Sequence, residues 1–235
     1  MSSTTWTPRA VASEAARCRT ELWRAVEAQH VASTTRLVDN LAEHEVLEDI
    51  LEGIKPQRPA ATAGLHDLLA TPFRYPPWGS GSRFRAATDP GVFYGADEPR
   101  TACAELGYWR WRFLTDSASL EELGPVSHTV FRSRIDARAV DLRRQPSSRH
   151  SAKWTDPDDY TATQTFARIA RDARIELIRY QSVRDPQKGG CAALLDAGGF
   201  AAPRRPVAEQ TWFLTVTRTI SAWQRGKEQF EFRWA

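Results

Sequence analysis

The sequence contains three cysteines, one methionine and very little lysine. Cys18, Cys103 and Cys191 are odd in number and lack paired spacing, which argues against a disulfide framework and against a zinc site. No stretch approaches the roughly eighteen apolar residues of a membrane helix. The first residues also lack the basic start and apolar run of a secretion signal. These absences exclude a secreted disulfide scaffold and a membrane protein, and we expect a cytoplasmic location.

The basic residues are nearly all arginine, because only four of the 32 are lysines. The planar guanidinium group matches the geometry of phosphate, although the base composition of a genome produces the same bias. The 29 acidic residues leave a net charge of only +3, and the arginines are dispersed instead of forming one basic tract. A nucleic-acid-binding module built from these arginines and nine tryptophans is therefore the weaker alternative. We expect no direct nucleic-acid binding.

Metal ligands are also scarce in the sequence. The five histidines have no close metal-ligand spacing. Asp156, Asp158 and Asp159 precede a helical pattern, where aspartate commonly serves as a helix cap. We therefore expect no metal and no bound cofactor.

The length of 235 residues suits one core domain with an accessory segment. From about residue 8 to residue 54 the apolar pattern is typical of helices: Leu22 and Val26 lie four positions apart, and residues 47–54 repeat with helical spacing. Pro56 and Pro59 end that pattern, since proline cannot continue a helix.

These signals divide the chain in two. We predict an N-terminal helical extension over residues 1–58 and a main domain over residues 59–235. An oligomer contact or a partner-docking surface is possible for the extension, but a helical brace packed on the core is the favoured interpretation.

The main domain alternates apolar and polar residues with the period of strands. Strands are expected near residues 83–85, 92–95, 126–135, 140–142, 175–180, 212–220 and 230–234. A helix is expected after an Asp97 N-cap, with Trp109 and Phe113 among its buried residues and Glu105 beside the core. Another helix is expected after Asp159. The sequence predicts an α+β fold, with a mixed or antiparallel β core and flanking helices.

Arginine, tyrosine, glutamate and serine side chains are the groups needed to bind NAD and cleave its nicotinamide–ribose bond. Arginine binds a diphosphate through bidentate hydrogen bonds, and tyrosine stacks on nicotinamide or ribose. A carboxylate beside the ribose stabilises the positive charge that develops as the bond breaks. The candidate residues are Arg74, Tyr75, Arg83, Tyr94, Glu105 and Ser182. The loop from Gly79 to Ser82 resembles a phosphate-binding turn, but it lacks the lysine of a P-loop.

Several short blocks around these candidates resemble the RES domain, the toxin half of bacterial toxin–antitoxin pairs. The blocks are Arg74-Tyr75, Gly81-Ser82-Arg83-Phe84, Gly91 to Ala96, Thr101 to Glu105 and Tyr180 to Arg184. The resemblance covers roughly residues 70–220 and is most specific between residues 93 and 105. It implies a fold related to the ADP-ribosyltransferases. It also implies an enzyme that destroys NAD by phosphorolysis or hydrolysis and releases nicotinamide.

The resemblance further implies a role for each candidate. Glu105 is similar to the catalytic carboxylate, Ser182 to its polar partner, Tyr94 to the nicotinamide-side aromatic, and Arg74 and Tyr75 to a substrate-binding pair. Arg83 also lies in a matching block, so the sequence leaves open whether Arg74 or Arg83 takes the arginine role.

The same resemblance implies substrates and partners. NAD is the expected substrate, and inorganic phosphate is a candidate co-substrate. An Xre-type antitoxin that blocks the active site and a homodimer are the expected partners. Transfer of ADP-ribose to a protein or small molecule would use the same residues, and it stays an alternative.

Overall fold

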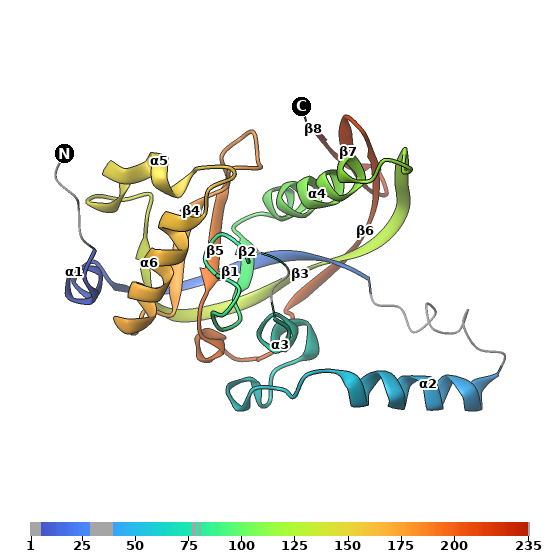
Figure 1. The fold of residues 1–235 in the computed structure, drawn as a ribbon, viewed down its shortest axis with the longest axis horizontal. Helices are drawn as coiled ribbons and strands as arrows, with labels where there is room; N and C mark the ends of the chain where they lie inside the picture. Colours follow the sequence, from blue (N-terminus) through green and yellow to red (C-terminus); the bar gives the residue numbers. More distant parts are fainter. Residues whose placement is uncertain (1–5, 29–39, 77–78, 80, 235) are drawn as a thin grey trace.

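A mixed β-sheet of eight strands forms the centre of the computed structural model, which describes residues 6–28, 40–76, 79 and 81–234 (Figure 1). The strands are β1 Ala16–Glu27, β2 Phe93–Ala96, β3 Glu122–Asp141, β4 Leu177–Gln181, β5 Gly190–Leu194, β6 Ala208–Thr217, β7 Ile220–Arg225 and β8 Glu228–Arg233. Their order is β1-β2-β5-β4-β3-β6-β7-β8, and β1 also pairs with β3, so the first five strands in this order close on themselves. Strands β3 and β4 pair in parallel, and the other pairs are antiparallel. The predicted α+β fold is confirmed.

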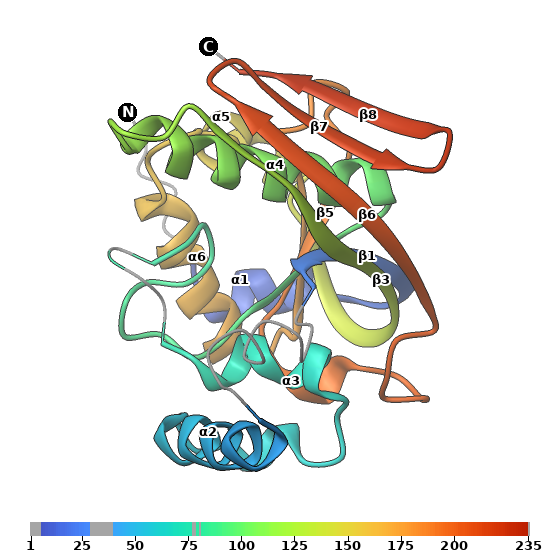
Figure 2. The same cartoon turned by 90° about the vertical axis from the view of Figure 1, so that its right-hand side faces the viewer.

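Helices cover both faces of the sheet. They are α1 Pro8–Ser13, α2 Leu41–Ile54, α3 Asp67–Arg74, α4 Pro99–Asp116, α5 Ser151–Trp154 and α6 Thr161–Asp172, with short 3-10 turns at Ala60–Thr62, Ser147–His150 and Ala197–Gly199. Helices α1, α5 and α6 contribute Val11, Trp154 and Phe166 to one core. Helix α3 contributes Leu69 to a second core. Helix α4 packs against β6, β7 and β8 in a third core, and it lies near the top of the molecule in Figure 2, with α3 below it.

The segment Ala16–Glu27 is a strand, so the prediction of a helix there is wrong. All its residues pair with β3. Leu22 and Val26 pack into one core, and Trp23 packs into the cores on the other side, which is the alternation of a strand. Residues four positions apart share a face in a strand as well as in a helix. The spacing of Leu22 and Val26 therefore could not distinguish the two.

The described part of the N-terminal segment is only partly helical. Helices α1 and α2 lie where helices were expected, but β1 lies between them and belongs to the same sheet as the strands of the main domain. The segment is thus joined to the main domain through backbone hydrogen bonds. A division of the chain at residue 58 stays a prediction.

Helix α4 begins one residue later than expected. Glu98 is the N-cap, and Pro99 occupies the first helical position, where its missing N–H costs nothing. The expected cap, Asp97, instead accepts two hydrogen bonds from Arg179 of β4, both at 2.6 Å.

The buried face of α4 also differs from the expected one. Trp109 and Phe113 are 49% and 57% exposed, so their predicted burial is wrong. The helix turns Gly107 and Trp111 toward the sheet instead. A Cβ on Gly107 would lie 2.6 Å from the hydroxyl oxygen of Ser221 in β7. The missing side chain therefore allows the close approach of α4 and β7, which sets the rotation of the helix.

None of the helices in the described part of the chain is both long and apolar enough to span a membrane. Within the same residues, no three histidine, cysteine, aspartate or glutamate side chains gather into a group that could hold a metal ion.

Candidate active site

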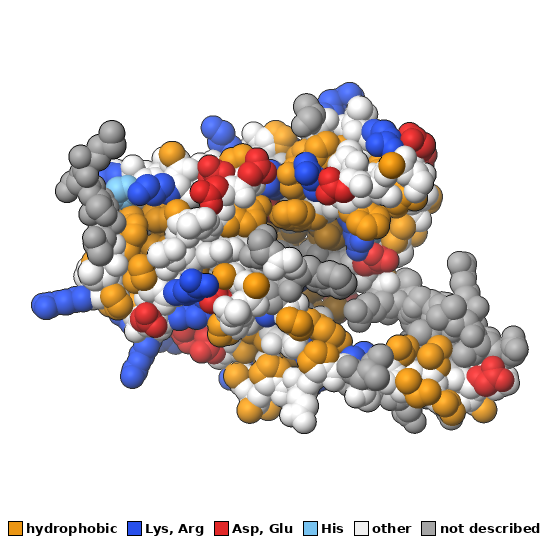
Figure 3. Space-filling view, in the orientation of Figure 1, with side chains coloured by type: hydrophobic (Ala, Val, Ile, Leu, Met, Phe, Trp, Pro, Cys, Tyr) orange, Lys and Arg blue, Asp and Glu red, His pale blue; other side chains and the backbone are white. Residues whose placement is uncertain are grey.

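A cavity of about 620 Å³ lies between the C-terminal end of α3 and the middle of α4, and the surface is visibly hollowed there (Figure 3). Of the predicted site residues, Tyr75, Arg83, Tyr94 and Glu105 line it. Ser182 contacts Glu105 from behind the lining. The cavity is further lined by Arg24, Arg85, Trp109, Tyr160, Tyr180 and Arg184.

Glu105 and Ser182 form the hydrogen-bonded pair at the centre of the site. The Ser182 hydroxyl donates to Oε1 of Glu105 at 2.5 Å. Ser182 is only 1% exposed, and its oxygen accepts hydrogen bonds from the backbone N–H groups of Arg184 and Asp185 at 3.2 and 2.9 Å. These bonds orient the hydroxyl toward Glu105. The structure brings these two predicted residues together, and their joint role in the reaction stays a prediction.

The environment of Glu105 disfavours its charged form. Burial raises the pKa of this carboxyl above its ordinary value of 4.5. The hydrogen bond from Ser182 and the positive charges of Arg83 and Arg184 act in the opposite direction but do not cancel the effect. A carboxylate held in a poorly solvated site gains strongly from any positive charge that comes to it.

Arg83 is held in place by backbone carbonyls. A tight turn carries it, in which Ser82 and Arg85 exchange two backbone hydrogen bonds, so the strand predicted at residues 83–85 is wrong. Gly81 precedes the turn with a φ of +96°, and a Cβ there would lie 2.1 Å from the carbonyl oxygen of Arg85. The Arg83 guanidinium donates to the carbonyls of residues 154 and 156 at 3.1 and 2.8 Å. It also lies 4.7 Å from the centre of the Tyr160 ring.

Arg184 approaches the same region from the loop after β4. Its guanidinium donates to the carbonyl of Pro157 and to the Tyr160 hydroxyl, the latter at 3.3 Å. It stacks over the Tyr108 ring at 3.6 Å. Arg83 and Arg184 therefore share Tyr160 as a neighbour, which brings two fixed cations to the Glu105 side of the cavity.

Tyr94 connects the turn to the sheet. Its hydroxyl lies 2.8 Å from the Ser82 hydroxyl and accepts a hydrogen bond from the Phe84 N–H at 2.9 Å. Burial raises the pKa of Tyr94, so the phenol stays neutral near pH 7. Its ring remains a wall of the cavity. An aromatic contact of Tyr94 to a bound ring stays a prediction.

Arg74 does not line the cavity. It is the last residue of α3, and its Nε donates to the carbonyl of Pro56 at 2.5 Å. Its neighbour Tyr75 does line the cavity and is 37% exposed. The position of the two arginines thus favours Arg83 over Arg74 for substrate binding.

Arg24 is a site residue that the sequence interpretation missed. It lies on β1, and its Nη1 donates to the Tyr94 carbonyl at 2.8 Å. Its Nε is buried and has no hydrogen-bond partner among the described residues. Burial lowers the pKa of Arg24 to about 10, which still leaves it charged at neutral pH. The alternation along residues 16–27 was the available signal, because it puts this arginine on the same face as Leu22 and Val26.

The arginines of the cavity differ from most others in the described residues by having no acidic partner. Each of Arg24, Arg83, Arg85 and Arg184 lacks a carboxylate within ion-pair distance there, whereas Arg17, Arg100, Arg143, Arg179, Arg218 and Arg225 each have one. Glu105 is the one acidic residue among the cavity lining. Unneutralised guanidinium groups in a cavity form a binding site for an anionic ligand.

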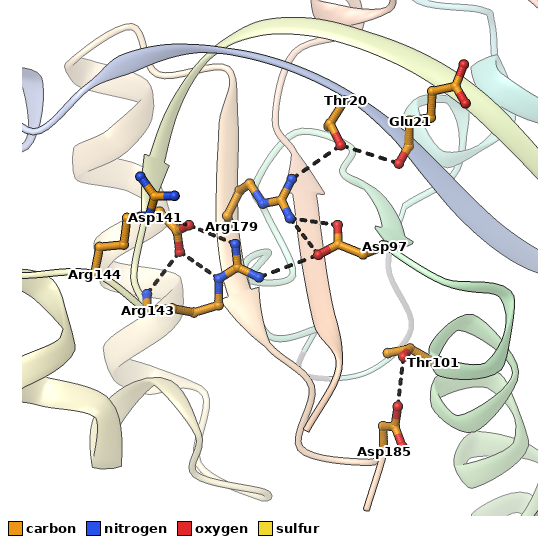
Figure 4. Close-up of polar contacts among 9 residues, drawn as sticks. All are labelled: Thr20, Glu21, Asp97, Thr101, Asp141, Arg143, Arg144, Arg179 and Asp185. Atoms are coloured by element: carbon orange, nitrogen blue, oxygen red, sulfur yellow. Dashed lines mark hydrogen bonds and ion pairs between the residues drawn. The ribbon is translucent and has the colours of Figure 1, made fainter. Parts of the chain in front are cut away.

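Asp185 fixes the serine loop to the glutamate helix. Its carboxylate accepts a hydrogen bond from the Thr101 hydroxyl at 2.7 Å (Figure 4). It also accepts one from Arg100, and both residues lie in the first turn of α4. Its own N–H donates to the Ser182 oxygen. The residue therefore ties Ser182 to the helix that carries Glu105.

A second anchor holds the start of α4. Arg179 reaches from β4 to Asp97, and Arg143 lies between Asp97 and Asp141 (Figure 4). The two anchors lie on either side of the β2–α4 junction, so the position of Glu105 is set by charged contacts as well as by core packing.

Replacing Asp185 by asparagine should lower the free energy of unfolding by about 1–3 kcal/mol, because buried hydrogen bonds to charged groups are lost. Urea denaturation monitored by tryptophan fluorescence measures this. Asp158→Asn, at an exposed position, is the matched control and should change little. Equal stability of the two variants would show that Asp185 does not anchor the loop.

The fold and the site together define a class of protein: an α+β domain with a cavity lined by arginines that have no carboxylate within ion-pair distance among the described residues. The chain belongs to the RES domain family, whose model matches residues 55–217. Strand β1 and Arg24 lie before the matched span. No curated protein matches the chain.

A solved structure has the same fold. The chain is similar to one in the crystal structure of the M. tuberculosis MbcT-MbcA toxin-antitoxin complex, with a TM-score of 0.51 and 12% identity. The likeness covers 90% of this chain and 92% of that one, so it includes most of both. At this identity it shows a shared fold.

Proposed function

We propose that this protein is the toxin of a bacterial toxin–antitoxin system and that it degrades NAD by cleaving the nicotinamide–ribose bond. The observation that carries the proposal is the Glu105 carboxylate, held by Ser182 in a cavity whose arginines have no acidic partner. Membership of the RES domain family and the fold shared with a chain of a toxin–antitoxin complex support the toxin role.

In the proposed reaction the arginines bind the diphosphate and the ribose lies against Glu105. As the bond between C1′ and the nicotinamide nitrogen breaks, the electron pair leaves with nicotinamide and positive charge develops on the ribose. The carboxylate stabilises that charge. Ser182 keeps the carboxylate in position by its hydrogen bond. Nicotinamide needs no general acid, because it leaves as a neutral ring.

The aromatic residues of the cavity suit the binding of the nicotinamide ring. Tyr94, Tyr180 and Trp109 line its walls, and flat rings stack favourably on such side chains. Burial raises the pKa of Tyr180 well above its ordinary value, so it stays neutral and acts as an apolar surface.

The test is a time course of NAD with the purified protein, in which nicotinamide release is followed by chromatography. Parallel reactions with and without inorganic phosphate separate phosphorolysis from hydrolysis, and labelled NAD with cell extract detects ADP-ribose on macromolecules. Failure to release nicotinamide under all these conditions would refute the proposed function.

The proposed antitoxin, of Xre type, would cover the mouth of the cavity. Exposed aromatic side chains lie beside it: Trp109 lines the cavity, and Phe113 follows one turn later on α4. Hydrophobic side chains are visible over this helix in Figure 3. Large exposed apolar groups commonly mark protein interaction sites. A homodimer is also proposed, by analogy with the family.

Replacing Phe113 by arginine should weaken inhibition by the cognate antitoxin by about tenfold or more, since a charge would be buried in the interface. Phe113 does not line the cavity, so nicotinamide release without antitoxin should be unchanged. Titrating antitoxin against turnover measures both quantities. Phe213→Arg, at an exposed apolar position on β6, is the control for a non-specific effect. Unaltered inhibition of the Phe113 variant would place the antitoxin elsewhere.

A further inference from the structure

The cavity has two ends of different composition. At the α4 end lie Glu105, Trp109 and Arg184. At the α3 end lie Tyr75 and Arg85, which are joined by a hydrogen bond from the Arg85 Nη2 to the Tyr75 carbonyl at 2.9 Å. In Figure 2, α4 lies near the top of the molecule and α3 lies below it, above α2. A dinucleotide whose nicotinamide ribose lies against Glu105 therefore extends its adenosine half toward Arg85.

Among the described residues, no carboxylate lies within ion-pair distance of Arg85 at that end. Its Nε donates to the carbonyl of Asp89 at 3.2 Å, so both of its hydrogen bonds go to backbone oxygens. The negative charge of Asp89 acts on Arg85, but its carboxylate accepts hydrogen bonds from Arg168 at 2.9 Å and from the Ala86 N–H at 2.8 Å. The Nη1 group of Arg85 makes no hydrogen bond to the described residues. A cation is thus fixed in the cavity wall with donors still available to a ligand.

The number of cations exceeds what NAD requires. Arg24, Arg83 and Arg184 already supply fixed guanidinium groups for the two phosphates of the dinucleotide. The adenosine half of NAD carries no further anion that would meet Arg85. NADP differs from NAD by a phosphate on the 2′-oxygen of the adenosine ribose, and arginine is the side chain that commonly accommodates this group.

We propose that Arg85 forms a subsite for the 2′-phosphate, so that NADP is a substrate of this protein at least as good as NAD. The inference rests on the proposed function and deepens it. Free phosphate, as the acceptor of ADP-ribose, would have to attack C1′ beside Glu105, and Arg85 at the α3 end is poorly placed for that. The reaction with NADP balances with water: the C1′–nitrogen bond breaks, water oxygen bonds to C1′, and nicotinamide, 2′-phospho-ADP-ribose and one proton are released.

The experiment compares kcat/KM for NADP and NAD in the wild type, in Arg85→Gln and in Arg17→Gln. The wild type should use NADP at least as efficiently as NAD. Arg85→Gln should lower the ratio of the NADP value to the NAD value by about tenfold or more, as expected for the loss of a charge-assisted bond to phosphate. Arg17→Gln removes an exposed charge outside the cavity lining, and should leave the ratio unchanged. An NAD preference of the wild type by about tenfold or more, or an equal loss for both substrates in Arg85→Gln, would overturn the inference.

A binding measurement separates this inference from the proposed function. Calorimetry with adenosine 2′,5′-bisphosphate and with adenosine 5′-monophosphate reports the subsite without turnover. Tighter binding of the bisphosphate, lost in Arg85→Gln, supports the subsite even if neither dinucleotide is cleaved. Equal binding of the two probes to the wild type would refute the 2′-phosphate subsite, but it would not contradict the proposed cleavage of NAD.

Discussion

Replacing Glu105 by glutamine is expected to lower the rate of nicotinamide release by at least about 10²-fold, the effect of removing one preorganised electrostatic group from an active site. Glutamine has nearly the same shape and can still accept the hydrogen bond from Ser182, so the cavity should be preserved. What is lost is the negative charge beside the ribose. The loss should fall mainly on kcat, because that charge acts on a cation that exists only as the bond breaks.

The same substitution should stabilise the folded protein at neutral and alkaline pH. The folded-state pKa of Glu105 is raised by burial above its ordinary value of 4.5, so between the two values the folded protein holds a proton that the unfolded chain has lost. Stability therefore falls as the pH rises through that window, and the full cost is present above the folded pKa. Glutamine carries no such cost, and the midpoint of thermal unfolding should rise.

Glu98→Gln is the matched control for both measurements, since it lies on the exposed N-cap of the same helix and makes no capping hydrogen bond through its side chain. It should keep wild-type turnover. A Glu105→Gln variant that is more stable yet as active as the wild type would remove Glu105 from the mechanism, and could not be explained by misfolding.

The raised pKa also predicts the pH dependence of the wild type. If the carboxylate is the active form, kcat/KM should fall as the pH is lowered through the folded-state pKa of Glu105, above the pH at which an ordinary glutamate titrates. The charges of Arg83 and Arg184 oppose the effect of burial. When either arginine is neutralised, the pKa of Glu105 should rise further. The fall of kcat/KM on the acid side should then begin at a higher pH.

Much of the centre of the fold could be predicted from sequence because its signals are local. The strand near Tyr94, the helix that carries Glu105 and the strand that ends before Ser182 each show a pattern within a few residues. The rotation of α4 could not be predicted in this way. It depends on the contact of Gly107 with Ser221, a residue far along the chain, and so the wrong aromatic residues were expected to be buried.

The site was predicted less completely than the fold, for a related reason. Glu105 and Ser182 come together because β2, β5 and β4 are neighbours in the sheet, and the resemblance to a family carried that information. For the arginines, closeness in sequence to the other candidate residues does not indicate which of them line the cavity. Arg74 lies next to Tyr75 in the chain but bonds to Pro56, whereas Arg24 reaches the cavity from a strand that was interpreted as a helix.

Arg24 supports the second prediction with a large expected effect. Its side chain is fixed by a bond to the Tyr94 carbonyl and lies 5.1 Å from the centre of the Phe93 ring, while its buried Nε has no partner among the described residues. An orphaned charged donor in a cavity is costly, and a phosphate oxygen would satisfy it. Arg24→Gln should therefore lower kcat/KM for the dinucleotide by about 10- to 100-fold.

Most of that loss should appear in KM, because the diphosphate is bound equally before and during bond cleavage and uniform binding does not change kcat. Steady-state kinetics separates the two parameters. Arg17→Gln is the control on the same strand, since Arg17 is exposed and bonds to Asp136 outside the cavity. Arg24→Lys keeps the charge without the planar fork and should lie between the wild type and Arg24→Gln. A loss in kcat alone, or none beyond that of Arg17→Gln, would mean that the diphosphate does not lie against β1.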